Sequence, residues 1–168
     1  MMMRSGLCVA TALGILFPAA SFSERASTVP LTWSVADWPY ARDGWPAGRA
    51  FACRGTSCPR EAILTVRVKL GMCNCGTGVR DDAEVDALSD VDLISSAFTP
   101  DAPGAVLQSG RLVGRIREYH AVIDGKEKRL IGVVLNRDCD VIAGALMTPA
   151  SDRRDWATDF ASLVKEAL

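Results

Sequence analysis

The chain has 168 residues, a formal net charge of −1 and 49% hydrophobic residues. The near-balanced, slightly acidic charge argues against nucleic acid as a partner, and the apolar fraction is that of a folded protein rather than a disordered one. The length is sufficient for a single domain with its own core.

Residues 1–21 have the layout of a signal peptide. Arg4 precedes an apolar stretch, 7–17, which at about 11 residues is too short to cross a bilayer, since that takes about 20 residues. Pro18 interrupts the stretch, and small residues follow up to Ser21, near which we expect cleavage. The sequence therefore predicts export to an oxidising compartment, with no stable membrane span after removal of the signal.

Residues 22–60 are rich in proline, glycine and tryptophan, so we expect an irregular segment packed on the core. Its three tryptophans are Trp33, Trp38 and Trp45. Such rings bring large apolar areas, and we expect them to fasten the segment to the core. The alternative is an aromatic platform for a ligand.

Residues 61–70 show the clearest strand pattern. Four apolar residues alternate with polar ones, which predicts one buried face and one face in water. The residues expected to be buried are Leu64, Val66, Val68 and Leu70, and those expected in water are Thr65, Arg67 and Lys69.

Helices are predicted at two later places. Asp81 and Glu84 have the spacing of a capping box, which predicts a short helix beginning after Asp81. A last helix is expected after Ser151, with one apolar face made of Trp156, Phe160, Leu163 and Val164.

Between these helices the pattern predicts antiparallel strands. They cover 106–123, 130–135 and 141–147, and Asp124-Gly125 is typical of a hairpin turn. Residues 61–168 are thus expected to form an α+β core, an antiparallel sheet with two main helices, within a single domain that is crosslinked by disulfides.

Four cysteines lie close together, with the spacing C-x4-C-x14-C-x-C: Cys53, Cys58, Cys73 and Cys75. In an exported protein such residues usually form disulfides. Cross-pairing between the first two and the last two is geometrically easier than a bond between Cys73 and Cys75, but the pairing is not deducible from the sequence. Cys139 stands between Asp138 and Asp140 and is our candidate for the unpaired thiol.

Two alternatives remain for this cysteine cluster. Four thiolates can hold zinc, and a Cys-x-Cys pair can hold Cu(I), so Cys53, Cys58, Cys73 and Cys75 are candidate metal ligands. A bond between Cys73 and Cys75 would instead be a candidate for thiol–disulfide exchange, although the chain has no Cys-x-x-Cys motif. With structural disulfides, no cofactor is expected.

Two groups of charged residues also stand out. Acidic residues follow one another in the first predicted helix, where we expect a solvated helix start. A basic run begins with Arg111, Arg115 and Arg117, which share one face of a strand, and we expect that face to be in water. The alternative is contact with an acidic partner.

Three segments carry a resemblance. They are Phe51-Ala52-Cys53, the run 66–82 around Cys73-Asn74-Cys75, and the run 136–141 that contains Cys139. These segments resemble parts of small, exported, uncharacterised proteins of alphaproteobacteria. The resemblance implies a bacterial periplasmic location and no particular activity.

No common catalytic motif is visible in the sequence, whereas residues that form crosslinks are abundant. We therefore expect an exported periplasmic binding or accessory protein, stabilised by disulfides, rather than an enzyme. Its partner would be a protein or a small ligand that the sequence does not identify. The alternative is a periplasmic redox or metal-handling protein that uses Cys73 and Cys75.

Overall fold

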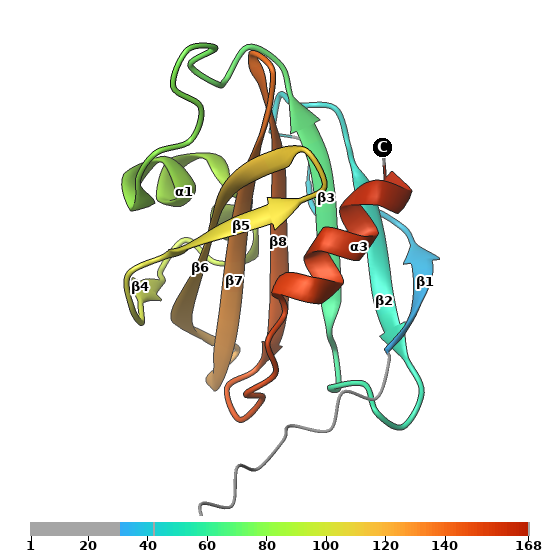
Figure 1. Cartoon of the computed structure of the whole chain (residues 1–168). Helices are drawn as coiled ribbons and strands as arrows, with labels where there is room; N and C mark the ends of the chain where they lie inside the picture. Colours follow the sequence, from blue (N-terminus) through green and yellow to red (C-terminus); the bar gives the residue numbers. More distant parts are fainter. Residues whose placement is uncertain (1–30, 42, 168) are drawn as a thin grey trace, which may run out of the picture.

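The computed structural model describes residues 31–41 and 43–167, and the signal peptide predicted at 1–21 lies outside these residues. Their framework is one eight-stranded antiparallel sheet, in the order β1-β2-β3-β8-β7-β6-β4, with β5 paired to β6 as well (Figure 1). The strands are β1 (Thr32–Ala36), β2 (Arg49–Arg54), β3 (Ile63–Lys69), β4 (Thr99–Pro100), β5 (Ala105–Ser109), β6 (Leu112–Ile123), β7 (Lys126–Arg137) and β8 (Asp140–Pro149).

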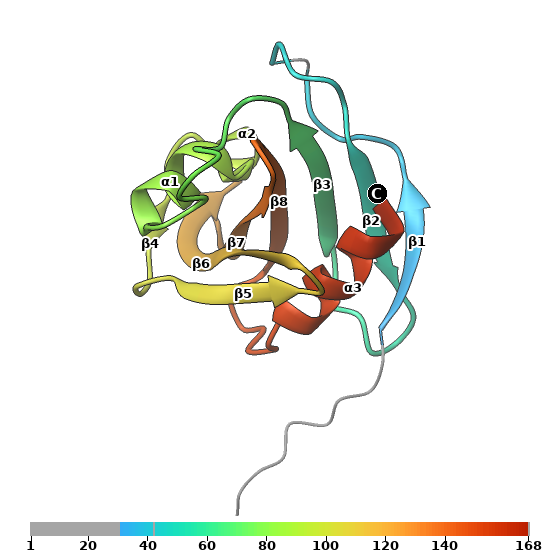
Figure 2. The same ribbon diagram turned by 45° about the horizontal axis from the view of Figure 1, so that its top comes forward.

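Three helices accompany the sheet, and their bounds are α1 (Asp82–Leu88), α2 (Val91–Ile94) and α3 (Ala157–Ala167). The sheet curves around α3, and β5 crosses beside that helix (Figures 1 and 2). The Ser109 hydroxyl of β5 donates to the Ala161 carbonyl of α3 at 2.8 Å. We call the side covered by α3 and β5 the inner face, and the side covered by α1 and α2 the outer face. None of the helices described is long and apolar enough to cross a membrane.

The inner face holds the largest apolar cluster. Phe160, Leu163 and Val164 of α3 pack with Trp156 against alternate residues of the central strands, so the predicted apolar face of the last helix is buried. The strand residues in this cluster are Phe51, Leu64, Val66, Leu107, Ile131, Val133, Leu135, Ile142 and Leu146. The ring of Phe160 lies so close to Gly144 that a Cβ there would be 2.9 Å from the Phe160 Cε1 atom.

Local signals in the sequence correspond to the observed turns and caps. Asp81 caps α1 by accepting from the Glu84 amide, and the Glu84 carboxylate accepts in return from the Asp81 amide, which makes the predicted capping box. Asp124 and Gly125 both have positive φ, as the predicted hairpin turn between β6 and β7 requires.

Two expectations about the fold need correction. The segment 22–60, expected to be irregular, contributes β1 and β2 to the sheet, although its residues 22–30 lie outside the described part. Strands dominate the chain, so it matches the predicted α+β class only loosely, while the antiparallel sheet, two helices of seven or more residues and the disulfides are present.

Candidate functional site

A group of four charged residues, three of them buried and one exposed, lies on the outer face of β3. This group, the outer cluster, consists of Arg67, Lys69, Asp90 and Asp43. The Arg67 guanidinium donates to Asp90 at 2.8 and 2.6 Å and to Asp43 at 2.9 and 2.5 Å. Lys69 Nζ lies 2.9 Å from an Asp90 carboxylate oxygen and donates to the Leu88 carbonyl at 2.8 Å. Two cations and two carboxylates thus balance one another.

This arrangement corrects the prediction that Thr65, Arg67 and Lys69 face water. The three residues are 0%, 4% and 6% exposed, respectively. The alternation along β3 is real, but its polar side is covered by the start of α2 and by the loop between β1 and β2. Burying a charge is costly unless a partner compensates it, so each member of the outer cluster requires the others.

The loop between β1 and β2 folds onto this cluster through Asp43. Hydrogen bonds from Arg67 hold the pKa of the Asp43 carboxyl well below its usual range. The Trp38 ring centroid lies 5.4 Å from the Arg67 Cζ atom, and Tyr40 packs edge-on against Trp38 at 5.5 Å. Burial raises the pKa of Tyr40 to about 12, so this phenol stays neutral. The loop is therefore anchored by charge and aromatic contacts together.

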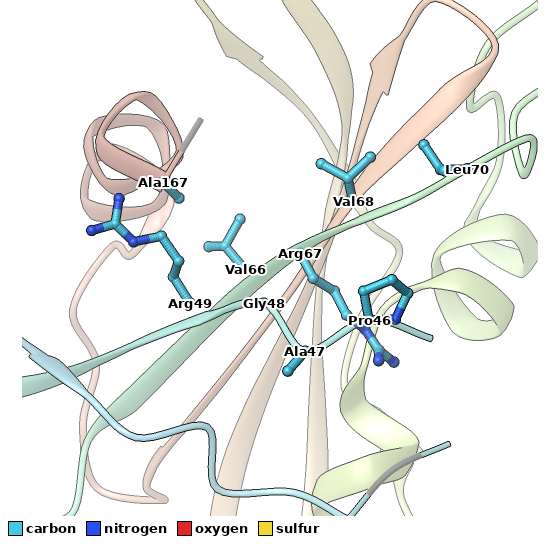
Figure 3. A pocket seen from close by; sticks show the side chains of 9 residues that line it. All are labelled: Pro46, Ala47, Gly48, Arg49, Val66, Arg67, Val68, Leu70 and Ala167. Atoms are coloured by element: carbon cyan, nitrogen blue, oxygen red, sulfur yellow. The ribbon is translucent and has the colours of Figure 1, made fainter. Parts of the chain in front are cut away.

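Two adjoining hollows flank the anchored loop. The first, the β3 hollow, has a volume of about 340 Å³ (Figure 3) and is lined by Pro46, Ala47, Gly48, Arg49, Val66, Arg67, Val68, Leu70 and Ala167. The second, the Trp hollow, has about 410 Å³ and is lined by Trp38, Ala41, Asp43, Gly44, Trp45, Pro46 and Ala47. Pro46 and Ala47 line both, so the two hollows meet at these residues.

The β3 hollow combines an apolar wall with one available cation. Val66 and Val68 project to one side of β3 and Arg67 to the other, toward Pro46 (Figure 3). Arg67 is saturated by carboxylates, whereas exposed Arg49 makes one side-chain hydrogen bond within the described residues, to the Glu166 carbonyl at 2.5 Å. An apolar ligand with a negative charge fits such a lining.

The structure contains two disulfides, Cys53–Cys58 and Cys75–Cys139. Cys139 was our candidate for the unpaired thiol, and that prediction is wrong: among the described cysteines the free thiol is Cys73. The reason is tertiary, because the turn between β7 and β8 lies beside the end of β3, where the Cys73 amide donates to the Cys139 carbonyl at 3.2 Å. The cross-pairing of Cys53 or Cys58 with Cys73 or Cys75, which we expected to be easier, does not occur either.

Cys73 is a weak nucleophile in this environment. Its thiol donates to the Asn136 Oδ1 atom at 3.2 Å, and Asn136 also accepts from the Val79 amide. Burial, together with the charges of Glu84 and Asp140, raises the pKa of the Cys73 thiol. A raised pKa lowers the thiolate fraction, and the thiolate is the reactive form.

The structure brings together neither the Cys73–Cys75 pair nor the four-cysteine metal set. Cys53, Cys58 and Cys75 are all in disulfides, which leaves one thiolate donor of the four. Within residues 31–41 and 43–167, three or more histidine, cysteine, aspartate or glutamate side chains nowhere gather in a way that could hold a metal ion.

Two arginines of the basic run pair with two carboxylates of the acidic helix that the sequence singled out. Arg115 forms an ion pair with Asp82 at 2.5 Å and Arg117 with Asp86 at 2.7 Å, which joins the basic face of β6 to the acidic helix α1. Sequence reasoning treated both as faces in water. Instead Arg115 and Arg117 form an interface between a strand and a helix with Asp82 and Asp86.

A comparison of the chain with models of known protein families finds no match, and a comparison with curated protein sequences finds none either. The fold and the site therefore define the class only as a disulfide-crosslinked antiparallel sheet with a solvent-accessible hollow at one edge. Sequence reasoning singled out Trp38 and Trp45 but missed Asp43, Arg67 and Asp90. No local signal identifies them, because they come from three separate parts of the chain.

Proposed function

We propose that this chain is an exported binding protein of the bacterial periplasm, stabilised by disulfides, whose ligand occupies the β3 hollow. The observation that carries the proposal is a hollow whose apolar lining includes partly exposed Val68 and exposed Leu70, beside the guanidinium of Arg49. Pockets for small ligands commonly have this composition, apolar with a few placed polar groups.

A rigid support for the hollow favours binding. Val66 and Val68 belong to a strand that is paired with β8 along its whole length, and the opposite wall is anchored to Arg67 by Asp43. A wall that is already in place loses little conformational entropy when a ligand binds. The two disulfides favour an oxidising compartment, as proposed for this chain.

The binding function can be tested with anilinonaphthalene sulfonate, a fluorescent dye with an apolar body and one negative charge. We expect saturable fluorescence enhancement that Leu70→Glu reduces at least about tenfold, since a like charge in the hollow opposes the sulfonate. Val122→Glu, at an exposed position of β6, is the matched control and should bind as the native protein does. Equal dye binding by both variants would contradict the assignment of the site.

Export can be tested separately. Expression in a bacterium, followed by alkylation and intact mass measurement of the periplasmic protein, should give two disulfides and one alkylated thiol at Cys73. A protein retained in the cytoplasm with its signal segment and all six cysteines reduced would argue against export.

A further inference from the structure

We propose that Cys73, Cys75 and Cys139 form a thiol–disulfide exchange site, in which Cys139 can bond to either Cys75 or Cys73. In the observed pairing the free thiol among the described cysteines is the half-buried Cys73, and in the exchanged pairing it is the exposed Cys75. The exchange therefore decides whether a reactive thiol is presented to solvent. This chemistry is separate from ligand binding in the β3 hollow.

The first observation is that the Cys75–Cys139 disulfide is open to solvent. It joins the loop after β3 to the turn between β7 and β8 at one end of the sheet (Figure 1), and both of its cysteines are exposed. In the other disulfide, Cys53 and Cys58 are both half-buried. Exposed disulfides are in general the labile ones, so Cys75–Cys139 is the better target for a thiol.

The second observation places Cys73 beside Cys139. The Cys73 amide donates to the Cys139 carbonyl at 3.2 Å. Residues paired in this way have Cα atoms about 5.5 Å apart, which lies within the range that a disulfide requires. Cys73 also packs against Val134 and Val141, so its side chain lies over the hairpin that carries Cys139. A Cys73–Cys139 bond therefore needs side-chain rotation and little movement of the backbone.

The third observation concerns the contact that holds the Cys73 thiol. This thiol donates to the Asn136 Oδ1 atom at 3.2 Å, and the same oxygen accepts from the Val79 amide. A thiol is a weak donor, so little is lost when it leaves. Asn136 stays bonded to Val79, and its oxygen is not left without a partner. The observed position of the thiol is thus one that it can leave at small cost.

The exchange step conserves atoms and electrons. Cys73 loses its proton to solvent, and the resulting thiolate attacks the Cys139 Sγ atom. The Cys73–Cys139 bond forms as the Cys75–Cys139 bond breaks, and Cys75 leaves as a thiolate that takes up a proton. The step consumes no oxidant or reductant, and the loop after β3 stays tied to the same turn in both forms.

The surroundings of Cys73 make the exchange slow and dependent on pH. The charged groups that face the thiol are Glu84 of α1 and Asp140 of β8, while β7 contributes the neutral Asn136. Burial and these two carboxylates raise the pKa of the Cys73 thiol. Because the thiolate is the attacking form, the rate should rise about tenfold for each pH unit below that pKa.

The test follows the free thiol in the exported chain, from which the signal segment and Cys8 have been removed. The oxidised protein is held at pH 8, and samples are quenched in acid, alkylated with excess N-ethylmaleimide in denaturant and mapped by mass spectrometry without reduction. We expect label to pass from Cys73 to Cys75 within hours, together with a Cys73–Cys139 peptide pair, and to stay in place at pH 5. Label confined to one cysteine at pH 8, or label that moves to Cys139, would overturn the proposal.

Two serine variants separate this site from the second disulfide. When Cys75→Ser is exported to the periplasm, where disulfides form, it should contain a Cys73–Cys139 disulfide. Cys58→Ser is the matched control and should carry Cys53 and Cys73 as two alkylated thiols. Two alkylated thiols in folded Cys75→Ser would contradict the exchange. If that variant does not fold, the label mapping of the native chain decides.

A third variant tests the charge beside the attacking thiol. Glu84→Gln keeps a side-chain acceptor for the α1 capping box and removes one negative charge that faces Cys73, so the label should move about two- to threefold faster at pH 8. Asp92→Asn, at an exposed position of α2, should leave the rate unchanged. Equal rates in Glu84→Gln and the native chain would rule out Cys73 as the attacking thiol.

Discussion

The two faces of the sheet are both buried, but by different means. On the inner face, α3 and β5 cover apolar side chains such as Phe160 and Leu64. On the outer face, α2 and the loop between β1 and β2 cover the outer cluster, in which Asp90 is 0% exposed. Apolar packing tolerates shape-conserving changes, whereas a buried charge tolerates no loss of its partners. The inner face therefore supplies the main apolar core. The outer face positions the loop between β1 and β2, which borders the two hollows.

The largest effect is expected for Asp90→Ala. This change leaves Lys69 with only the Leu88 carbonyl and Arg67 with only Asp43, so the free energy of unfolding should fall by about 3–5 kcal/mol. Denaturant titration measures it. A second change, Lys69→Met, should restore part of the lost stability, because it removes the buried ammonium group that no longer has Asp90 as its partner.

Phe160→Ala on the inner face is the matched comparison. It should lower the free energy of unfolding by a similar amount, about 3–5 kcal/mol. In the double variant with Lys69→Met, however, the effects of the two changes should be additive. If the effects of Asp90→Ala and Lys69→Met on the free energy of unfolding were also additive, the outer cluster would not act as a coupled unit.

The disulfides should differ in their contributions. Cys75–Cys139 joins residues 64 apart, and Cys53–Cys58 residues 5 apart. The chain-entropy model gives about 4 kcal/mol for the longer loop and about 2 kcal/mol for the shorter one. Cys139→Ser should therefore destabilise the protein more than Cys58→Ser in a denaturant titration. The reverse order would show that local strain or residual structure outweighs loop length.

A smaller effect, dependent on pH, is expected for Asp43→Asn. The folded pKa of Asp43 lies below that of the unfolded chain, near 3.9, so its stabilisation is present above that pH and lost as the pH falls. At pH 7 the free energy of unfolding of the native protein should be about 2 kcal/mol larger than that of the variant. This is the size of a hydrogen bond to a charged group.

This difference should shrink below about pH 4, where the unfolded chain takes up a proton at Asp43. Leu163→Ala on the inner face is the control, since its cost should not change with pH. A constant difference between native protein and Asp43→Asn across this range would contradict the ion pair.

The smallest effect is expected for Asp81→Ala. Loss of the α1 cap should cost about 1 kcal/mol, measured by thermal unfolding. Because α1 covers the outer face, Val85 should become more mobile, which amide exchange can detect. Asp101→Ala, in an exposed loop, should be close to neutral.

Several elements could be predicted because their signals are local. The capping box, the Asp124-Gly125 turn and the apolar face of α3 all depend on residues within one or two turns of each other. The strand pattern of 61–70 also gave the correct apolar face through Val68. The exposed Leu70 departs from it because β3 ends at Lys69.

The candidate site could not be predicted in this way. Asp43 and Asp90 lie 24 and 23 residues from Arg67 in opposite directions along the chain, and a polar residue in an alternating strand is usually in water. Pairing of Cys139 with Cys75 likewise depends on β8 lying beside β3. The local sequence around either cysteine does not indicate that arrangement of strands.

Periodicities, caps and turns are readable from the sequence because they follow from backbone geometry over a few residues, and the number of cysteines in an exported chain indicates crosslinks. Which charges lie together on β3 and which cysteines pair could be read only from the folded chain. These features depend on distances between segments far apart in the chain, and the sheet order is what brings those segments into contact.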